Sequence, residues 1–224
     1  MKADHRSAAG THPAQDSSAS SRIGMWLFLA SEILLFGGLF LLYSVYRFRH
    51  PAEFHAASLQ LNRIAGTANT VVLLTSSLAV ALSLFHLREK ADARGASHFL
   101  AAAIALGAVF LVVKGFEWAE KFRTGLFPSS PALLAQSRGE VLYVGLYFAM
   151  TGLHALHLIV GIGVLAVMLA LLARTGVTPV RGATPGVRGV TPPSRVAQLE
   201  NAGLYWHLVD IIWIFLFPLF YLIS

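Results

Sequence analysis

Cysteine is absent from the 224 residues of the chain. Its absence excludes disulfide bonds, thiolate metal sites and cysteine nucleophiles. Charge is scarce as well: Asp, Glu, Lys and Arg make up 12% of the residues, against about 25% in soluble domains. Hydrophobic residues account for 56%. This composition predicts an integral membrane protein.

The common catalytic signatures are also missing. The sequence contains no P-loop, no G-x-G-x-x-G, no H-E-x-x-H and no G-x-S-x-G. Nothing in it therefore assembles a nucleophile with a base and an oxyanion hole. We expect no catalytic residue, no cofactor and no metal in this chain, and no enzymatic activity of the chain on its own.

Five apolar runs are long enough to cross a bilayer as helices of about 20 residues. They predict an all-α integral membrane protein, a five-transmembrane-helix bundle occupying 22–223. The fourth run is too long for one perpendicular crossing, so it must tilt or protrude. The five helices are expected at about 25–46, 67–87, 99–118, 141–172 and 203–223.

Two segments are expected to lie outside the bundle. Residues 1–21 are polar and rich in Ala and Ser, which predicts a disordered tail. Residues 174–195 repeat Pro, Gly and Arg, cannot bury a core, and are expected to form a flexible loop.

The net charge of +6 comes largely from basic residues in short loops between apolar runs. There they act as topology signals and contact lipid headgroups, so the lipid bilayer is the expected partner rather than nucleic acid. Lys and Arg are more frequent on the side of the N-terminus. This bias predicts a cytoplasmic N-terminus and an external C-terminus.

Glu32 lies eight residues past Gly24, about 12 Å into the bilayer at 1.5 Å per residue. Phe28 and Phe36 flank it at four-residue spacing, and this apolar setting favours a neutral carboxyl unless the group is paired or hydrated. Two interpretations are open. In the functional one, Glu32 belongs to a proton pathway or contacts lipid. In the structural one, it is a neutral side chain that is hydrogen-bonded between helices.

His154 and His157 lie three residues apart near the middle of the fourth run. Two histidines on one helix face, with no cysteine or acidic residue near them in sequence, provide too few ligands for a strong metal site. The pair also cannot supply both axial ligands of one haem, because these approach from opposite faces. A structural role for both histidines is favoured.

The fifth run begins with a tryptophan, a histidine and an aspartate. His207 and Asp210 share one helix face, and Trp206 and Asp210 belong to a neighbouring stripe that continues toward the C-terminus. An imidazole and a carboxyl in a spanning segment are costly unless they face a partner or water. This helix is therefore expected to direct one polar face toward a neighbouring helix or water, in addition to crossing the membrane.

Lys114 and Glu117 end the third run, with Trp118 following. Lys side chains extend to the interface, and Trp is enriched at headgroup depth. The favoured interpretation is an ion pair at the membrane surface beside an aromatic anchor.

Together these motifs resemble subunit III of the haem–copper oxidases, over about residues 22–223. Five segments match that family in order. They are Arg22 to Phe36 with the membrane-embedded Glu32, Leu61 to Ser77, Phe116-Glu117-Trp118, Tyr147 to Gly161, and Tyr205 to Trp213.

The resemblance implies a non-catalytic subunit of a respiratory terminal oxidase in the bacterial inner membrane. Its expected partners are subunit I and subunit II, and haem and copper are expected in those partner subunits. The family also implies bound phospholipid, support of proton uptake by subunit I, and stabilisation of subunit I during turnover.

The longer family members have seven helices, and this chain corresponds to the last five. Five-helix versions resemble subunits of bacterial quinol oxidases and of some cytochrome c oxidases. They also resemble an accessory membrane protein of nitric-oxide reductase. The sequence does not choose among these, nor does it indicate the electron donor or the haem type.

Two further classes are less favoured. A b-type haem membrane anchor would take His154 and His207 as axial ligands from two helices. A proton-coupled transporter would use Glu32 and Asp210, but the sequence shows no internal repeat and no pair of broken helices.

Overall fold

The computed structural model describes residues 13–174 and 193–222, with side chains from 23–174 and 195–222. All regular secondary structure in the described residues is helical. The elements are α1 (Pro13–Arg49), α2 (Pro51–Ser58), α3 (Arg63–Glu89), α4 (Ala93–Arg123), α5 (Pro131–Leu134), α6 (Arg138–Arg174) and α7 (Pro193–Tyr221).

Five helices of the described chain are long and apolar enough to span a membrane. They are Ile23–Arg49 within α1, all of α3, α4 and α6, and Arg195–Tyr221 within α7. The prediction of an all-α protein with five membrane helices is therefore confirmed. The two short helices, α2 and α5, lie in the connections before α3 and α6.

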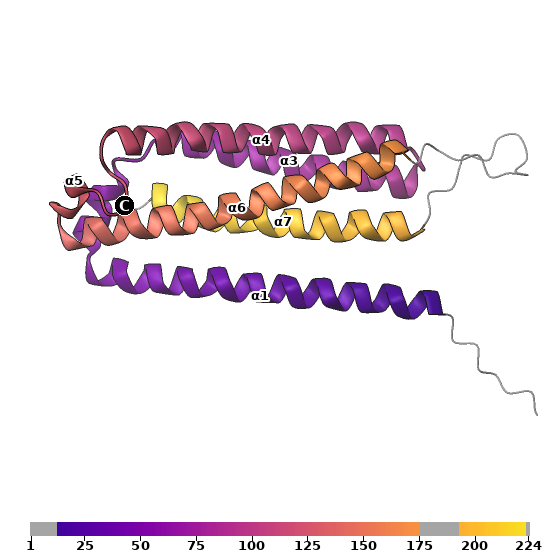
Figure 1. Cartoon of the computed structure of the whole chain (residues 1–224), viewed down its shortest axis with the longest axis horizontal. Helices are drawn as coiled ribbons and strands as arrows, with labels where there is room; N and C mark the ends of the chain where they lie inside the picture. The colour runs from indigo at the N-terminus through magenta and orange to yellow at the C-terminus, as the bar shows by residue number, and fades with distance from the viewer. Residues whose placement is uncertain (1–12, 175–192, 223–224) are drawn as a thin grey trace, which may run out of the picture.

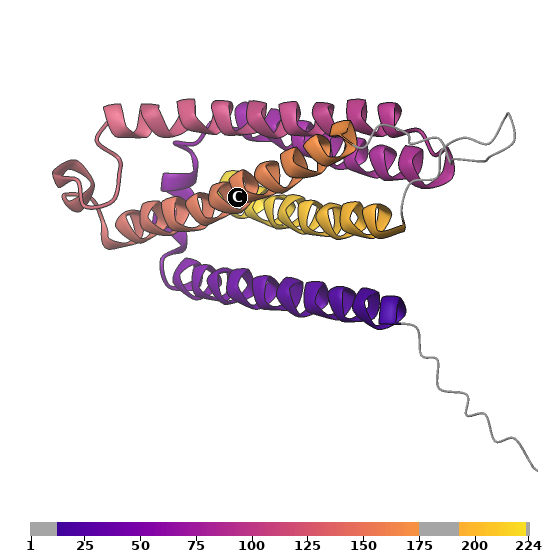
Figure 2. The ribbon, with the colours of Figure 1, turned by 45° about the vertical axis from the view of Figure 1, so that its right-hand side comes forward.

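Four of the spanning helices form a ring in which α3 packs on α4, α4 on α6, α6 on α7 and α7 on α3. Helix α1 lies along the flank made by α6 and α7 (Figures 1 and 2). In its most apolar window, 11% of the residues of α1 are buried, against 50% in α7. Helix α7 is thus the centre of the bundle and α1 its most lipid-exposed part.

The spanning helices alternate in direction, which gives the bundle two ends. We call the end where α1, α4 and α7 begin the N-side, and the end where they finish the C-side. In Figure 1 the C-side is at the left, with α5 and the last described residues of α7.

Local sequence chemistry sets several helix ends. Pro51 lacks the N–H that would extend α1, so the chain breaks at His50 and restarts as α2. The Asn62 side chain caps α3 by accepting the Ala65 N–H at 3.0 Å. Asp92 caps α4 through the Gly95 N–H at 3.0 Å, and this hydrogen bond, helped by His86, lowers the pKa of the Asp92 carboxyl.

Helix α6 is 37 residues long, which corresponds to about 55 Å at 1.5 Å per residue. The hydrocarbon core of a bilayer is only about 30 Å thick. Figures 1 and 2 show α6 inclined to α4, as the length of its apolar run predicts.

All five spanning helices extend beyond at least one of their predicted limits, and α1, α4 and α7 do so most. Helix α7 begins at Pro193 rather than at 203, so residues 193–195 of the predicted flexible loop are helical. Helix α1 begins at Pro13, so residues 13–21, predicted as part of a disordered tail, are helical. Extending an existing helix costs less than nucleating one, which explains the added turns. Residues 1–12 and most of the Pro/Gly segment 174–195 lie outside the described residues. Helix α4 continues to Arg123, well past the predicted end at 118.

Trp206 of α7 occupies the middle of the ring and is fully buried. Its indole lies against two glycines: a Cβ at Gly107 of α4 would come within 2.8 Å of the ring, and one at Gly161 of α6 within 3.0 Å. The indole N–H donates to the Ser76 hydroxyl of α3 at 3.1 Å. One side chain therefore joins all four helices of the ring.

Gly161→Val should destabilise the bundle, because the new side chain meets the Trp206 ring. We expect the free energy of unfolding to fall by about 1–3 kcal/mol, the usual cost of overpacking. The matched control is Gly163→Val on the same helix, where a Cβ meets nothing within 4 Å. Denaturant titration in detergent micelles measures both, and equal losses would show that the Trp206 contact is not limiting.

Candidate functional site

Glu32 of α1 and His157 of α6 form a contact between the flanking helix and the ring. The Glu32 Oε2 and His157 Nε2 atoms are 2.8 Å apart, with the side chains 13% and 15% exposed. The other ring nitrogen, Nδ1, lies 2.8 Å from the Leu153 carbonyl oxygen. That oxygen can only accept, so Nδ1 carries a proton.

This geometry leaves one further proton for the pair. Either a neutral Glu32 donates it to His157 Nε2, or His157 is doubly protonated and faces a Glu32 carboxylate. Both forms are hydrogen-bonded, so the contact can hold a proton within the membrane at low cost. The absence of an acid next to His157 in sequence was therefore misleading, because the acid comes from a helix 125 residues away.

Aromatic side chains close this contact on two sides. Phe36 presents its ring to His157 in an edge arrangement at 5.4 Å. The Tyr205 hydroxyl donates to the His157 carbonyl at 3.0 Å, and Tyr205 in turn packs on Phe28 at 5.8 Å. The pair is thus shielded within an otherwise apolar helix interface.

His154, one turn away on α6, is placed differently. Its ring is 1% exposed and packs on Phe110 at 5.6 Å and on Trp213 at 5.2 Å. Neither ring nitrogen has a hydrogen-bond partner among the described residues. The ring acts here as a packing group between α4, α6 and α7.

The structure does not bring His154 and His207 into a common ligand position. His207 Nδ1 lies 2.5 Å from the Ser77 hydroxyl of α3, while aromatic rings enclose His154. In the described part of the chain, no three His, Asp or Glu side chains gather to hold a metal. The geometry therefore does not favour the haem-anchor interpretation.

Asp210, one turn after Trp206, is buried with 3% exposure. Neither carboxyl oxygen makes a hydrogen bond with a described residue. The sequence placed His207 and Asp210 on one polar face, but the structure separates their surroundings. His207 is half-buried at a groove, whereas Asp210 is inside the ring.

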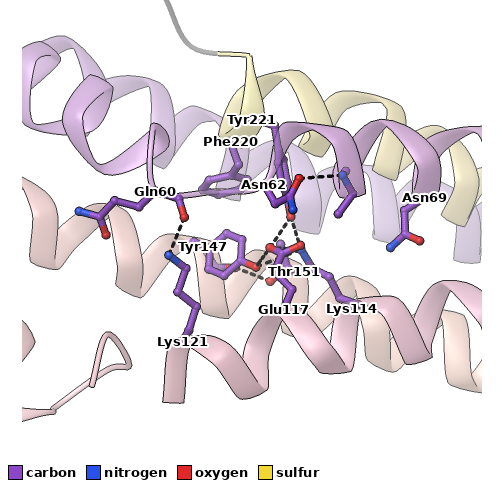
Figure 3. A network of polar contacts seen from close by, with 12 residues as sticks. Gln60, Asn62, Asn69, Lys114, Glu117, Lys121, Tyr147, Thr151, Phe220 and Tyr221 are labelled. Atoms are coloured by element: carbon purple, nitrogen blue, oxygen red, sulfur yellow. Dashed lines mark hydrogen bonds and ion pairs between the residues drawn. The ribbon is translucent and has the colours of Figure 1, made fainter. Parts of the chain in front are cut away.

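A second polar network lies toward the C-side and joins α4, α6 and α7 (Figure 3). Lys114 Nζ is 3.1 Å from Glu117 Oε1 and donates to the Tyr147 hydroxyl at 3.0 Å and to that of Tyr221. Both tyrosines also donate to Glu117 Oε1, Tyr221 at 2.6 Å. Lys114 further lies 5.1 Å from the centre of the Trp213 ring.

This network corrects the interpretation of Lys114 and Glu117 as an ion pair at the membrane surface. Their side chains are 3% and 9% exposed, and Tyr147 and Tyr221 complete their hydrogen bonds. The error has a simple cause: α4 ends at Arg123 rather than near 118, so Lys114 lies more than two turns inside the helix. Trp118 packs on Phe148 of α6 at 5.4 Å.

A polar cavity of about 590 Å³ opens beside this network on the C-side. Glu117 forms part of its wall, and Lys121 crosses it to the Gln60 carbonyl at 2.9 Å. The position of Tyr221, which brings an α7 hydroxyl into the network, could not be inferred from spacing along the chain. Its contact with Glu117 joins residues 104 apart.

Lys114→Met should be strongly destabilising, because it leaves the Glu117 carboxylate buried without a cation. Removing one partner of a buried pair costs about 3–5 kcal/mol. The double variant Lys114→Met/Glu117→Gln removes both charges and should recover most of the loss. Thermal unfolding in detergent tests this, and a double variant no more stable than the single one would contradict it.

Comparison with known proteins identifies the family to which this chain belongs. A family model described as cytochrome c oxidase subunit III matches residues 4–224. A cytochrome c oxidase subunit 3 from Thermostichus vulcanus is 29% identical over 202 residues, covering 90% of this chain and 87% of the relative. A cytochrome bo(3) ubiquinol oxidase subunit 3 from Pseudomonas putida is 27% identical, covering 93% and 88%.

A third relative joins two subunits in one polypeptide. A haem–copper oxidase subunit I+III from Aeropyrum pernix is 28% identical over 207 residues, which are 90% of this chain but 22% of that longer protein. Neither these relatives nor the geometry favours a haem anchor, a proton-coupled transporter or an accessory protein of nitric-oxide reductase. The chain belongs to the cytochrome c oxidase subunit III family.

Proposed function

We propose that this chain is the non-catalytic subunit III of a respiratory haem–copper oxidase, docked on subunit I in a bacterial inner membrane. The match to the family model over residues 4–224 carries this proposal. The subunit I+III relative supports the docking, because in that protein the parts corresponding to subunit I and subunit III belong to one polypeptide. Haem and copper would reside in the partner subunits, with subunit II completing the complex.

Within such a complex the chain would stabilise subunit I and support lipid and proton access to it. Glu32 and His157 fit the second role, since they hold a proton between α1 and α6. An apolar groove of about 360 Å³ lies beside them on the N-side, lined by Phe28, Val164 and Tyr205 among others. A phospholipid acyl chain suits such a lining.

The proposed orientation places the N-side at the cytoplasm, following the excess of Lys and Arg there. Proton uptake and the Glu32–His157 contact would then be reached from that side. The electron donor is a property of the other subunits, as the names of the two relatives, one for cytochrome c and one for ubiquinol, illustrate.

Co-purification tests the proposed assembly. A tagged chain is extracted in mild detergent, and a visible spectrum and subunit masses are taken from one fraction. We expect a haem–copper subunit I to co-elute, with haem bands belonging to that partner. A fraction in which the chain itself carries the haem band, or runs colourless and alone in several mild detergents, would contradict the proposal.

Glu32→Gln should lower turnover of the complex at alkaline pH while leaving turnover at acidic pH and assembly intact. The reason is that Gln keeps a hydrogen bond to His157 but carries no exchangeable carboxyl proton, which matters most where protons are scarce. Oxygen consumption across pH measures this, with Glu89→Gln at the exposed end of α3 as control. Unchanged turnover with weaker retention in detergent would assign Glu32 a structural role instead.

A further inference from the structure

Asp210 is an unusual group in the ring. Its side chain is 3% exposed, neither oxygen is hydrogen-bonded among the described residues, and no ion pair within that part of the chain includes it. An isolated carboxylate in an apolar interior is very costly. Such a site is satisfied when the carboxyl binds a proton or when water enters.

A short polar route leads from Asp210 to the protein surface. Asp210 follows His207 by three residues on α7, so the two side chains are neighbours on one helix, and the Ser77 hydroxyl of α3 lies 2.5 Å from His207 Nδ1. Because a hydroxyl both donates and accepts, Ser77 can take a proton from His207 and release its own toward Asp210, and rotation of the O–H about the Cβ–Oγ bond then resets it.

His207 forms part of the wall of a groove of about 360 Å³ on the N-side, between α1, α3 and α7. Trp26, Leu84 and Glu200 also line this groove, and Glu200 pairs with Arg88 at 3.2 Å where Arg88 is exposed to solvent. The lining therefore combines an exposed ion-paired carboxylate with the His207 imidazole. Apart from Glu200, no carboxyl of the described residues lines this groove.

Several titratable groups on the helices packed around α7 have other partners. His157 is paired with Glu32 of α1, and His86 of α3 is paired with Asp92. Lys114 of α4 and Tyr147 of α6 belong to the C-side network. His154 of α6 is enclosed by Phe110 and Trp213, whereas His207, three residues before Asp210 on the same helix, lines the N-side groove.

We propose that Asp210 is an internal proton-accepting site, loaded from the N-side groove through His207 and Ser77 and separate from the Glu32–His157 contact. In one transfer, His207 Nε2 gains a proton from groove water and Nδ1 releases its own to the Ser77 oxygen. The Ser77 hydroxyl proton passes to the Asp210 carboxylate. One proton enters and one negative charge is neutralised, and the imidazole changes tautomer.

Infrared spectroscopy of the full chain in lipid nanodiscs tests the site without requiring oxidase activity. Acidification should produce a carboxylic-acid C=O band that Asp210→Asn abolishes and Glu32→Gln leaves in place. Aspartate labelled with ¹³C at its carboxyl carbon should shift this band, and Asp210 is the one aspartate within a spanning helix. A spectrum with no band shifted by the label, over the pH range in which the chain stays folded, would overturn the proposal.

Deuterium exchange of the same band tests the route. Ser77→Ala and His207→Phe should keep the band but slow its downshift after mixing with D₂O by about tenfold or more. Thr75→Ala is the matched control, since Thr75 is exposed on the same helix and bonds the Val71 carbonyl of its own helix. Exchange at the wild-type rate in both Ser77→Ala and His207→Phe would overturn the proposed path. The isotope label identifies the aspartate band in the wild-type chain, so the test does not require Asp210→Asn to fold.

Discussion

The packing of Trp206 between Gly107 and Gly161 is the contact on which the rest of the bundle depends. The indole allows α4 and α6 to approach α7 closely, and its hydrogen bond to Ser76 fixes the rotation of α7 against α3. Given that rotation, the next residue, His207, is directed to the N-side groove, while Asp210, one turn later, is directed inward. The steric requirement of one aromatic ring thus sets the positions of the polar groups that follow it.

The polar side chains divide into two regions with different physical character. On the C-side, Lys114, Glu117 and two tyrosines satisfy one another, forming a closed network that fixes α4, α6 and α7. Nearer the middle, Glu32, His157 and Asp210 have fewer hydrogen-bond partners among the described residues. The densely hydrogen-bonded groups and the sparsely bonded ones therefore lie in separate layers of the same bundle.

The number, order and helical nature of the spanning segments follow from the sequence, because each apolar run is long enough to satisfy its own backbone in a bilayer. The polar contacts do not follow, since they join residues far apart in the chain, such as Glu32 with His157 and Glu117 with Tyr221. Hydropathy locates an apolar core and not a helix end, so it predicts Lys114 at the surface although the side chain is buried within α4. Glu32 was recognisable as a polar group in need of a partner, but the identity of that partner required the fold.

The loose attachment of α1 has a consequence for how the protein is made. A ribosome delivers Glu32 to the membrane 125 residues before it delivers His157, so this acid spends the early part of synthesis without its partner. Helix α1 cannot reach its final position until α6 and α7 have been inserted. Closure of the Glu32–His157 contact therefore cannot precede insertion of α6, the fourth of the five spanning helices.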